Sequence, residues 1–285
     1  MNDKSIFLSL KDHSVSGESF QLRYNEDLDM LETYPQPEEK RLSEYYKSED
    51  YISHTDTKRN LLERLYHLVR RVSLKRKLKL INTFNSEEKL LLDIGCGTGD
   101  FLQVAQQDGW SVTGIEPDDS ARQIANSKTD NSVFNISYLD ELAENSFDVI
   151  TLWHVLEHLP NLETHIQRFK HLLKPNGTLI IAVPNFKSYD AQLYKNYWAA
   201  YDVPRHLWHF SKLSIQRLFK NVRLELVKTL PMKFDAYYVC LLSEKYKSGW
   251  MNPFKAFWFG YLSNRKAQTS KQYSSHIYVL KYQNN

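Results

Sequence analysis

The stretch Leu90–Phe101, LLLDIGCGTGDF, decides the fold of this chain. An apolar run ends at Asp93, glycines follow at positions 95, 97 and 99, and a helix-like segment begins at Phe101. A short apolar run before turn residues is typical of a buried strand in a parallel sheet. The glycines permit a tight turn and let a ligand lie against the main chain. The stretch therefore predicts a strand, a turn and a helix whose N-terminus faces a ligand.

The spacing of the three glycines bears on the kind of ligand. A dinucleotide site has the pattern G-x-G-x-x-G, with the pyrophosphate at the helix N-terminus. Here the pattern is G-x-G-x-G, and Asp100 stands where a phosphate would meet a carboxylate. A ligand with a cationic centre and a free amino group, such as S-adenosylmethionine, suits Asp93 and this loop better. A glycine-rich turn without a ligand is the structural alternative.

A second acid follows at the end of the next predicted strand. In nucleotide-binding sheets a carboxylate about 20 residues further on holds the ribose hydroxyls. Val112 and Ile115 are strand-like, Glu116 comes directly after them, and Pro117 stops the strand ladder. We expect Glu116 to bind a ribose, and a plain surface acid is the alternative.

Strand-like and helix-like segments alternate through the second half of the chain. Such alternation predicts an α/β fold with a doubly wound, mostly parallel sheet of seven strands. No helix precedes the last strand to make a right-handed crossover, so we expect that strand to be antiparallel. The strands are predicted at 90–94, 111–116, 133–136, 147–153, 178–184, 224–230 and 275–282, and the helices near 100–108, 119–127, 161–174 and 211–220.

Four motifs carry a family resemblance: Leu91–Phe101 (LLDIGCGTGDF), Val112–Pro117 (VTGIEP), Phe147–His158 (FDVITLWHVLEH) and Leu172–Gly177 (LLKPNG). In this order they resemble the motifs of class I S-adenosylmethionine-dependent methyltransferases. The chain is similar to the small-molecule branch, which includes ubiquinone-type O-methyltransferases and sugar C-methyltransferases. The resemblance covers residues 90–230 and implies a Rossmann-like fold, S-adenosylmethionine as donor and S-adenosylhomocysteine as product.

The predicted cofactor site follows from the sheet. Ligands of such sheets bind beyond the carboxyl ends of the strands. Tyr138 and Leu139, after the third strand, could pack on an adenine ring. The predicted cofactor-binding residues are Asp93, Gly95, Cys96, Gly97, Thr98, Gly99, Glu116, Pro117, Tyr138, Leu139, Trp153 and His154.

Two histidines are the candidate catalytic residues. Methyl transfer needs a base only when the acceptor must lose a proton. His154 comes one residue after the strand beside the cofactor, and His206 is the second candidate base. A histidine that only packs the strand end is the alternative for His154, and by the resemblance His158 supports the loop more often than it does chemistry.

The segment 185–210 is long and rich in aromatic residues, and loops of this length in compact domains are usually functional. It could form a wall for a planar or apolar acceptor with an anionic or hydroxyl end. The predicted substrate-binding residues are Tyr197, Trp198, Arg205, His206 and His209, with Arg205 as anchor. A flap that merely covers the sheet edge is the alternative.

The N-terminal third is predicted as an extension over 1–55 and a basic amphipathic helix over 56–82, before a methyltransferase domain over 83–285. In the extension, Ser5–Leu10 and Phe20–Tyr24 are strand-like, and Glu38–Tyr46 is helix-like. Relatives often carry a four-cysteine zinc ribbon here, but no cysteine precedes Cys96, so we expect a degenerate ribbon and no metal. Asp56 or Thr57 can cap the start of the basic helix. Its basic side chains either form a solvated face or attract anionic lipid or a phosphorylated substrate.

A second insertion, 231–273, concentrates aromatic residues: Trp250, Phe254, Phe257, Trp258, Phe259 and Tyr261. Four roles are open for such a run: it can pack in the core, form a homodimer contact, cover an apolar substrate as a lid, or rest at a membrane interface. With the basic helix it favours a hydrophobic or amphiphilic small-molecule acceptor and peripheral contact with an anionic membrane.

Composition sets the remaining bounds. The net charge is only +3 and no recognition module accompanies it, so we expect no nucleic-acid partner. The two cysteines, Cys96 and Cys240, favour a reducing compartment, and the absence of a signal peptide makes a cytoplasmic location the expectation. The predicted function is methyl transfer to oxygen or carbon. A binder without turnover and an RNA or protein methyltransferase are the alternatives, and the glycine spacing disfavours a dehydrogenase.

Overall fold

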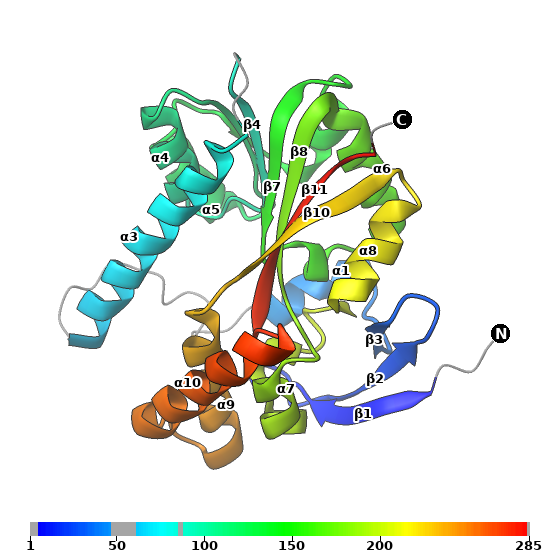
Figure 1. Ribbon diagram of the computed structural model, residues 1–285, viewed down its shortest axis with the longest axis vertical. Helices are drawn as coiled ribbons and strands as arrows, with labels where there is room; N and C mark the ends of the chain where they lie inside the picture. The colour runs from blue at the N-terminus through cyan, green and yellow to red at the C-terminus, as the bar shows by residue number, and fades with distance from the viewer. Residues whose placement is uncertain (1–4, 47–60, 85–87, 284–285) are drawn as a thin grey trace.

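A seven-stranded sheet organises the computed structural model, which describes residues 5–46, 61–84 and 88–283 (Figure 1). Its order is β10-β11-β8-β7-β4-β5-β6, and the strands from β8 to β6 are parallel, whereas β11 runs antiparallel to both neighbours. The strands are β4 (Leu90–Ile94), β5 (Ser111–Ile115), β6 (Val133–Phe134), β7 (Phe147–Trp153), β8 (Leu173–Pro184), β10 (Leu224–Pro231) and β11 (Ser275–Tyr282). The predicted doubly wound fold, with its antiparallel last strand, is confirmed.

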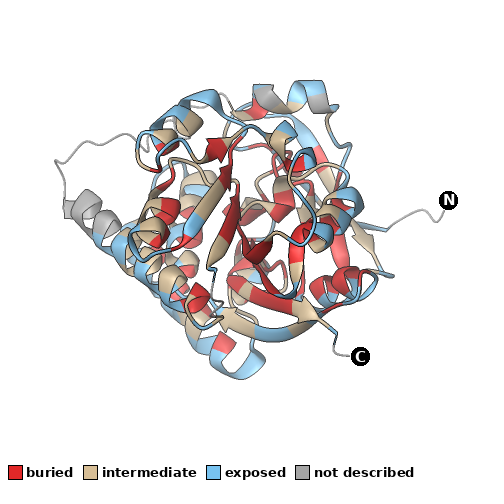
Figure 2. Ribbon diagram, turned by 90° about the horizontal axis from the view of Figure 1, so that it is seen from above, coloured by how far each residue is buried: buried red, intermediate tan, exposed pale blue. Residues whose placement is uncertain are grey.

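Helices cover both faces of this sheet because the apolar residues of its central strands alternate in direction. Leu92 and Ile150 face α6 (Leu162–Leu172) and α8 (Lys212–Lys220) in one buried cluster. Leu91 and Val149 face the other layer, which contains α3 (Leu61–Ile81), α4 (Asp100–Gln107) and α5 (Asp119–Asn126). Figure 2 shows the buried residues concentrated along the strands and on the inner sides of these helices.

A second, smaller sheet has the order β1-β2-β3-β9 and is antiparallel. Its strands are β1 (Ile6–Lys11), β2 (Ser19–Asn25), β3 (Met30–Tyr34) and β9 (Trp208–His209), and α1 (Glu39–Leu42) and a 3-10 turn at Ser43–Tyr46 follow β3. The sequence predicted two of these strands but missed β3, whose five residues lie between turn signals. Because β9 belongs to the segment 185–210, this sheet joins the N-terminal extension to the methyltransferase-like domain.

The two aromatic-rich segments contain more regular structure than the sequence predicted. The segment 185–210 holds α7 (Tyr189–Tyr194), 3-10 turns at Lys195–Tyr197 and Ala199–Tyr201, and β9. The insertion 231–273 is a helical hairpin of α9 (Asp235–Ser248) and α10 (Pro253–Ser270), which extends below the sheet in Figure 1. The prediction that no helix precedes the last strand was therefore wrong, although the strand is antiparallel as expected.

The predicted basic helix is α3, in the part of it that the structure describes. The predicted caps Asp56 and Thr57, and the basic Lys58 and Arg59, lie outside the described residues. Within the described part of the chain, no helix is both long and apolar enough to cross a bilayer.

Candidate active site

The glycine loop between β4 and α4 forms an open cradle. Gly95, Gly97 and Gly99 all have positive φ, at 68°, 54° and 76°. A Cβ atom on Gly95 would meet the Val155 side chain at 2.4 Å, and one on Gly99 would meet Ala125 at 2.8 Å, so packing explains these two glycines. A Cβ atom on Gly97 would meet nothing within 4 Å. Its bare backbone therefore faces space in which a ligand can approach the main chain.

Glu116 closes one side of this cradle. Its carboxylate accepts hydrogen bonds from the backbone N–H of Gly97 at 2.8 Å and of Asp118 at 3.0 Å. The side chain is 8% exposed, and burial raises its pKa above the ordinary value. The two N–H groups fix the carboxylate at the end of β5, where a ribose hydroxyl could donate to its remaining lone pairs.

Asp93 lies on the sheet side of the cradle and is 2% exposed. The hydroxyl of Thr151 on β7 donates to its Oδ1 at 2.5 Å. Burial raises the pKa of Asp93 to about 7, although the Thr151 hydrogen bond and the charge of Lys77 act in the opposite direction. A buried carboxylate of this kind favours a cationic ligand, because the ligand's charge offsets the cost of ionisation.

Lys77 is a residue of this site that sequence reasoning missed. Its ammonium group lies 4.3 Å from the centre of the Trp153 ring and 5.7 Å from that of Phe101. Burial lowers the pKa of Lys77 to about 8, while Asp93 and Asp235 oppose the shift. Nothing in the sequence separates Lys77 from the solvated lysines of the same helix, such as Lys75 and Lys79, because only packing turns it toward the sheet.

His154 follows Trp153 with φ at 59° and links two elements. Its Nε2 lies 3.1 Å from Asp235 Oδ2 at the start of α9, and its Nδ1 lies 3.4 Å from Glu157 Oε1. Burial disfavours the charged ring, but these two carboxylates raise the pKa of His154 to about 10. The imidazole is therefore protonated at neutral pH in this state, and it must lose that proton before it can act as the predicted base.

The remaining predicted cofactor residues follow the carboxyl ends of β4, β5 and β6. The Tyr138 ring stacks on Phe134 with centroids 4.0 Å apart, next to the buried Leu139 beyond β6. Burial raises the pKa of Cys96, so its thiol stays protonated. Thr98 donates to Asp100 Oδ2 at 3.1 Å, and Pro117 is exposed at the end of β5.

The predicted substrate residues do not line one open cavity. The Trp198 indole is 2% exposed and donates to Asp190 at 2.8 Å, and His209 is 4% exposed with Nε2 3.0 Å from Thr33 Oγ1. His206 is also buried, and Tyr197 is half-buried with its ring 5.4 Å from that of His13.

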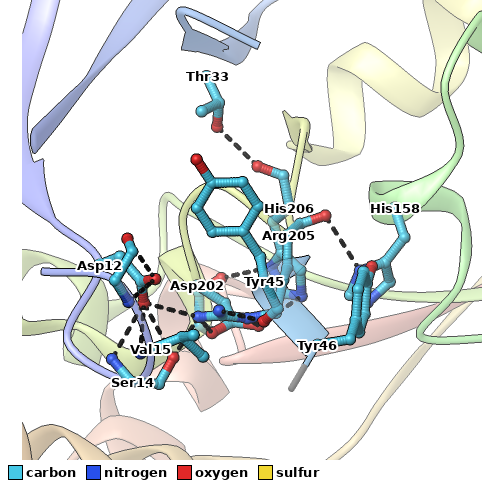
Figure 3. Close-up of polar contacts among 12 residues, drawn as sticks. Asp12, Ser14, Val15, Thr33, Tyr45, Tyr46, His158, Asp202, Arg205 and His206 are labelled. Atoms are coloured by element: carbon cyan, nitrogen blue, oxygen red, sulfur yellow. Dashed lines mark hydrogen bonds and ion pairs between the residues drawn. The ribbon is translucent and has the colours of Figure 1, made fainter. Parts of the chain in front are cut away.

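Arg205, the predicted anchor, lies in an ion-pair cluster between the small sheet and the segment 185–210 (Figure 3). Its guanidinium is 2.7 Å from Asp202 Oδ1 and 3.1 Å from Asp12 Oδ1, and it donates to the Tyr45 carbonyl at 2.9 Å. These partners use the donors that an anionic substrate would need. The surroundings of Arg205 are those of a structural ion pair.

Fold and crevice together define the class of protein. A seven-stranded sheet whose last strand β11 is antiparallel to its neighbours, an open glycine cradle after β4 and two buried carboxylates are the arrangement of a class I S-adenosylmethionine-dependent methyltransferase. Residues 61–229 match the family model of the methyltransferase domain. Because this match covers more than half of the chain, the chain belongs to that family.

Relatives agree with this assignment. The chain is 34% identical over 105 residues to a ubiquinone biosynthesis O-methyltransferase of Saccharophagus degradans, covering 34% of this chain and 44% of that protein. It is 32% identical over 109 residues to the protein of that name from Coxiella burnetii, covering 35% of this chain and 47% of that protein. The chain thus spans less than half the length of these curated relatives.

Solved structures share the fold. Magnesium protoporphyrin IX methyltransferase from Synechocystis, solved with bound S-adenosylhomocysteine, superposes with a TM-score of 0.56 at 15% identity, covering 86% of this chain and all of that one. A methyltransferase from Archaeoglobus fulgidus gives a TM-score of 0.50 at 17% identity, covering 74% of this chain and 94% of that one. At these identities the likeness concerns the fold alone.

Proposed function

We propose that the chain transfers a methyl group from S-adenosylmethionine to an oxygen of a small hydrophobic or amphiphilic acceptor. The observation that carries this proposal is the bare backbone of Gly97 in open space between two buried carboxylates, Asp93 and Glu116. Bound S-adenosylmethionine would supply a methyl group on a sulfonium for in-line displacement.

The residues of the chain itself would bind and orient the donor. Glu116 would hold the ribose hydroxyls, since two backbone N–H groups already fix its carboxylate. Asp93, which is 2% exposed, would balance the positive charge at the methionine end of the donor. The Tyr138 ring, which stacks on Phe134, offers an apolar surface for the adenine, and the buried Leu139 adjoins it in sequence. Lys77, Trp153 and Phe101 pack together beside the crevice and would exclude water from it.

Oxygen as the accepting atom is supported by the curated relatives, which are named as O-methyltransferases. His154 would contact the acceptor because it follows β7 directly and its ring is more than a third exposed. Both nitrogens of the protonated ring face carboxylates, so His154 would position the acceptor, and the proton of the acceptor hydroxyl would pass to the Asp235 carboxylate as the methyl group transfers.

An amphiphilic acceptor is supported by the exposed side of the α9–α10 hairpin. We call this surface the aromatic face; it consists of Tyr238, Trp250, Phe254, Phe257 and Trp258, which are 55%, 57%, 86%, 65% and 56% exposed. Between residues 236 and 270 the only acid is Glu244, which is buried, whereas five lysines and arginines are present. Aromatic and basic residues together favour an anionic membrane interface. Asp235, at the start of α9, connects this hairpin to His154.

Radiolabelled methyl transfer tests the proposal. Purified protein is incubated with methyl-labelled donor and with phenolic or polyprenylated hydroxyl compounds, and labelled product is counted. We expect label in an organic-soluble ether with the wild type, and a loss of about tenfold or more with Glu116→Gln, whose crevice loses a charged acceptor. Glu163→Gln, on the exposed side of α6, is the matched control and should keep wild-type activity.

Two results would contradict the proposal. Donor binding measured by calorimetry, with no labelled product from any acceptor or extract, would favour a binder without turnover. Label found in RNA or protein in place of a small molecule would favour the other alternative.

A further inference from the structure

Two buried polar atoms at the carboxyl end of the large sheet have no hydrogen-bond partner among the described residues. They are Nε1 of Trp153, the last residue of β7, and Oγ of Ser275, the first residue of β11. Ser275 is 1% exposed, so bulk solvent does not satisfy its hydroxyl. A buried donor without a partner is costly, and in a native structure it calls for an explanation such as a bound water or a ligand.

The two side chains lie on the same face of the large sheet. Trp153 pairs with Ala182 on β8, and Ala182 pairs with Ile277 on β11. Trp153 and Ile277 both pack against the buried cluster that includes residues of α3 and α4. Side chains two residues apart on a strand point to the same face, so Ser275 shares the face of Ile277. Because β11 is antiparallel to β8, its first residue stands at the carboxyl end of β8, opposite Pro184.

Backbone hydrogen bonds connect Ser275 with the pair formed by His154 and Asp235. The N–H of Met232 donates to the Ser275 carbonyl at 3.1 Å, and the N–H of Asp235 donates to the Met232 carbonyl at 3.3 Å. Asp235 Oδ2 contacts His154, whose N–H donates to the Ala182 carbonyl at 2.9 Å. Figure 1 shows this junction, where the α9–α10 hairpin joins β10 and β11. The two unpartnered donors therefore lie at the same end of the sheet as the side chains that would position the acceptor.

The chemistry of the two atoms restricts the group that they can bind. An indole Nε1 only donates a hydrogen bond, so the group that satisfies it must accept one. A serine hydroxyl can donate as well, and a carbonyl oxygen has two lone pairs, so it can accept from both. Asp235 is an acid at the same junction and would repel a carboxylate, so a neutral carbonyl oxygen fits the two donors best.

We propose that Ser275 Oγ and Trp153 Nε1 donate hydrogen bonds to a carbonyl oxygen of the methyl acceptor, in addition to the contacts of the hydroxyl that is methylated. The inference rests on the proposed methyl transfer and specifies its acceptor as a hydroxyl compound that also carries a ketone or ester group. An acceptor without that oxygen leaves both buried donors unpaired, which lowers its affinity. Ser275 and Trp153 thus select the acceptor and take no part in the transfer of the methyl group.

A matched pair of phenols tests the inference: para-butylphenol and para-hydroxybenzylacetone, which differ by one carbonyl oxygen outside the ring. Binding of each to the full chain is measured by calorimetry at saturating S-adenosylhomocysteine, so that no turnover is needed. We expect the wild type to bind the ketone about tenfold or more tightly than the alkylphenol. Ser275→Ala and Trp153→Phe should each reduce this ratio by about threefold or more, since each variant removes one hydrogen bond.

Ser274→Ala is the matched control. Ser274 is also 1% exposed, but its hydroxyl donates to the buried Asp190 at 2.7 Å. Ser274→Ala should keep the wild-type ratio of the two affinities and unfold at a lower urea concentration, because it leaves Asp190 with one donor fewer. Ser275→Ala should unfold at the urea concentration of the wild type or a higher one, because its hydroxyl has no partner among the described residues of the free protein.

Three results would overturn the inference. A wild type that binds the two phenols equally, or binds neither, would indicate that the two donors hold only water. An unchanged ratio in folded Ser275→Ala would remove Ser275 from the acceptor site, and weaker binding of S-adenosylhomocysteine by this variant would assign Ser275 to the donor. Incubation with methyl-labelled S-adenosylmethionine keeps the proposed function separate, because ketone binding without a labelled ether contradicts the proposed transfer but not the carbonyl site.

Discussion

At the scale of single residues, Asp93 and Glu116 serve one crevice in different ways. Glu116 accepts two backbone hydrogen bonds, which fix its position and stabilise its charge. Asp93 accepts one, from Thr151, and depends on a ligand or on Lys77 for further charge compensation. The two carboxylates should therefore respond differently to pH and to substitution.

Donor binding should depend on pH through Asp93, whose pKa is about 7 in the donor-free protein. A cationic donor prefers the ionised carboxylate, so binding below pH 7 releases a proton, and affinity rises with pH until it levels off above about 7. Because one proton is released, the donor affinity can change by at most about tenfold per pH unit. Calorimetry with S-adenosylmethionine across this range measures it. Asp93→Asn should bind more weakly and lose the slope, and an unchanged slope in that variant would contradict the assignment.

Gly97→Ala should abolish most donor binding with little loss of stability. The new methyl group would point into open space on the donor's side, and the positive φ would cost about 1 kcal/mol. Gly17→Ala is a matched control, because Gly17 also has positive φ and open surroundings but lies in the β1–β2 turn. Both variants should lose similar unfolding free energy in urea, while only Gly97→Ala loses donor affinity. Equal donor binding by the two would show that Gly97 does not contact the donor.

At the scale of elements, the small sheet and the segment 185–210 are joined by buried charges. Arg205 connects Asp12, after β1, with Asp202. Against the opposing effect of burial, the backbone N–H of Ser16 and the Arg205 guanidinium lower the pKa of Asp12, and the guanidinium lowers that of Asp202. Burial favours the uncharged acids, so the ion pairs must overcome that effect. The cluster explains why a two-residue strand, β9, can hold its place on the edge of the sheet.

Arg205→Met should destabilise the protein by about 3–5 kcal/mol, because it leaves the buried Asp12 and the half-buried Asp202 without their cation. Urea unfolding at pH 7 measures the loss. Arg41→Met removes an arginine whose side chain is 54% exposed and pairs with Glu18 and Glu44, and it should change stability by less than about 0.5 kcal/mol. If Arg205→Met remains as stable as the wild type but loses activity, the original prediction of a substrate anchor would be favoured.

At the scale of the whole molecule, the aromatic face and the crevice are connected through α9. Vesicle flotation should show binding to anionic but not to neutral liposomes, and weaker binding at high salt. The double variant Phe254→Ser and Trp258→Ser should reduce binding by about tenfold or more, since each buried aromatic side chain contributes about 1.5–3 kcal/mol. Ile124→Ser, on the exposed side of α5, is the control for surface polarity. If the double variant binds liposomes as well as the wild type, the aromatic face does not contact the membrane. If the wild type is a dimer in solution and the double variant is a monomer, the aromatic face is a dimer contact.

The sequence predicted the large sheet well because its central strands are short apolar runs, and β4, β8 and β10 stop at glycine or proline. Strand β8 alone began earlier than expected, at Leu173, because its first residues pair with β7 at an irregular register. The hairpin of α9 and α10 was read only as an aromatic-rich insertion, since its aromatic residues are exposed or only partly buried, as Tyr246 and Phe259 are, and do not mark one apolar face. Strand β3 was missed although it pairs with the neighbouring β2, because its five residues lie between turn signals.

The sequence by itself determined the parallel sheet, the glycine cradle and the two acids at strand ends, because each depends on residues close together in the chain. Tertiary structure alone decided the rest of the crevice. It turned Lys77 from a row of basic residues toward Trp153, placed Asp235 against His154, and brought Glu157 to His206. The physical reason is that burial and charge pairing depend on which distant segments pack together, and local sequence does not specify that packing.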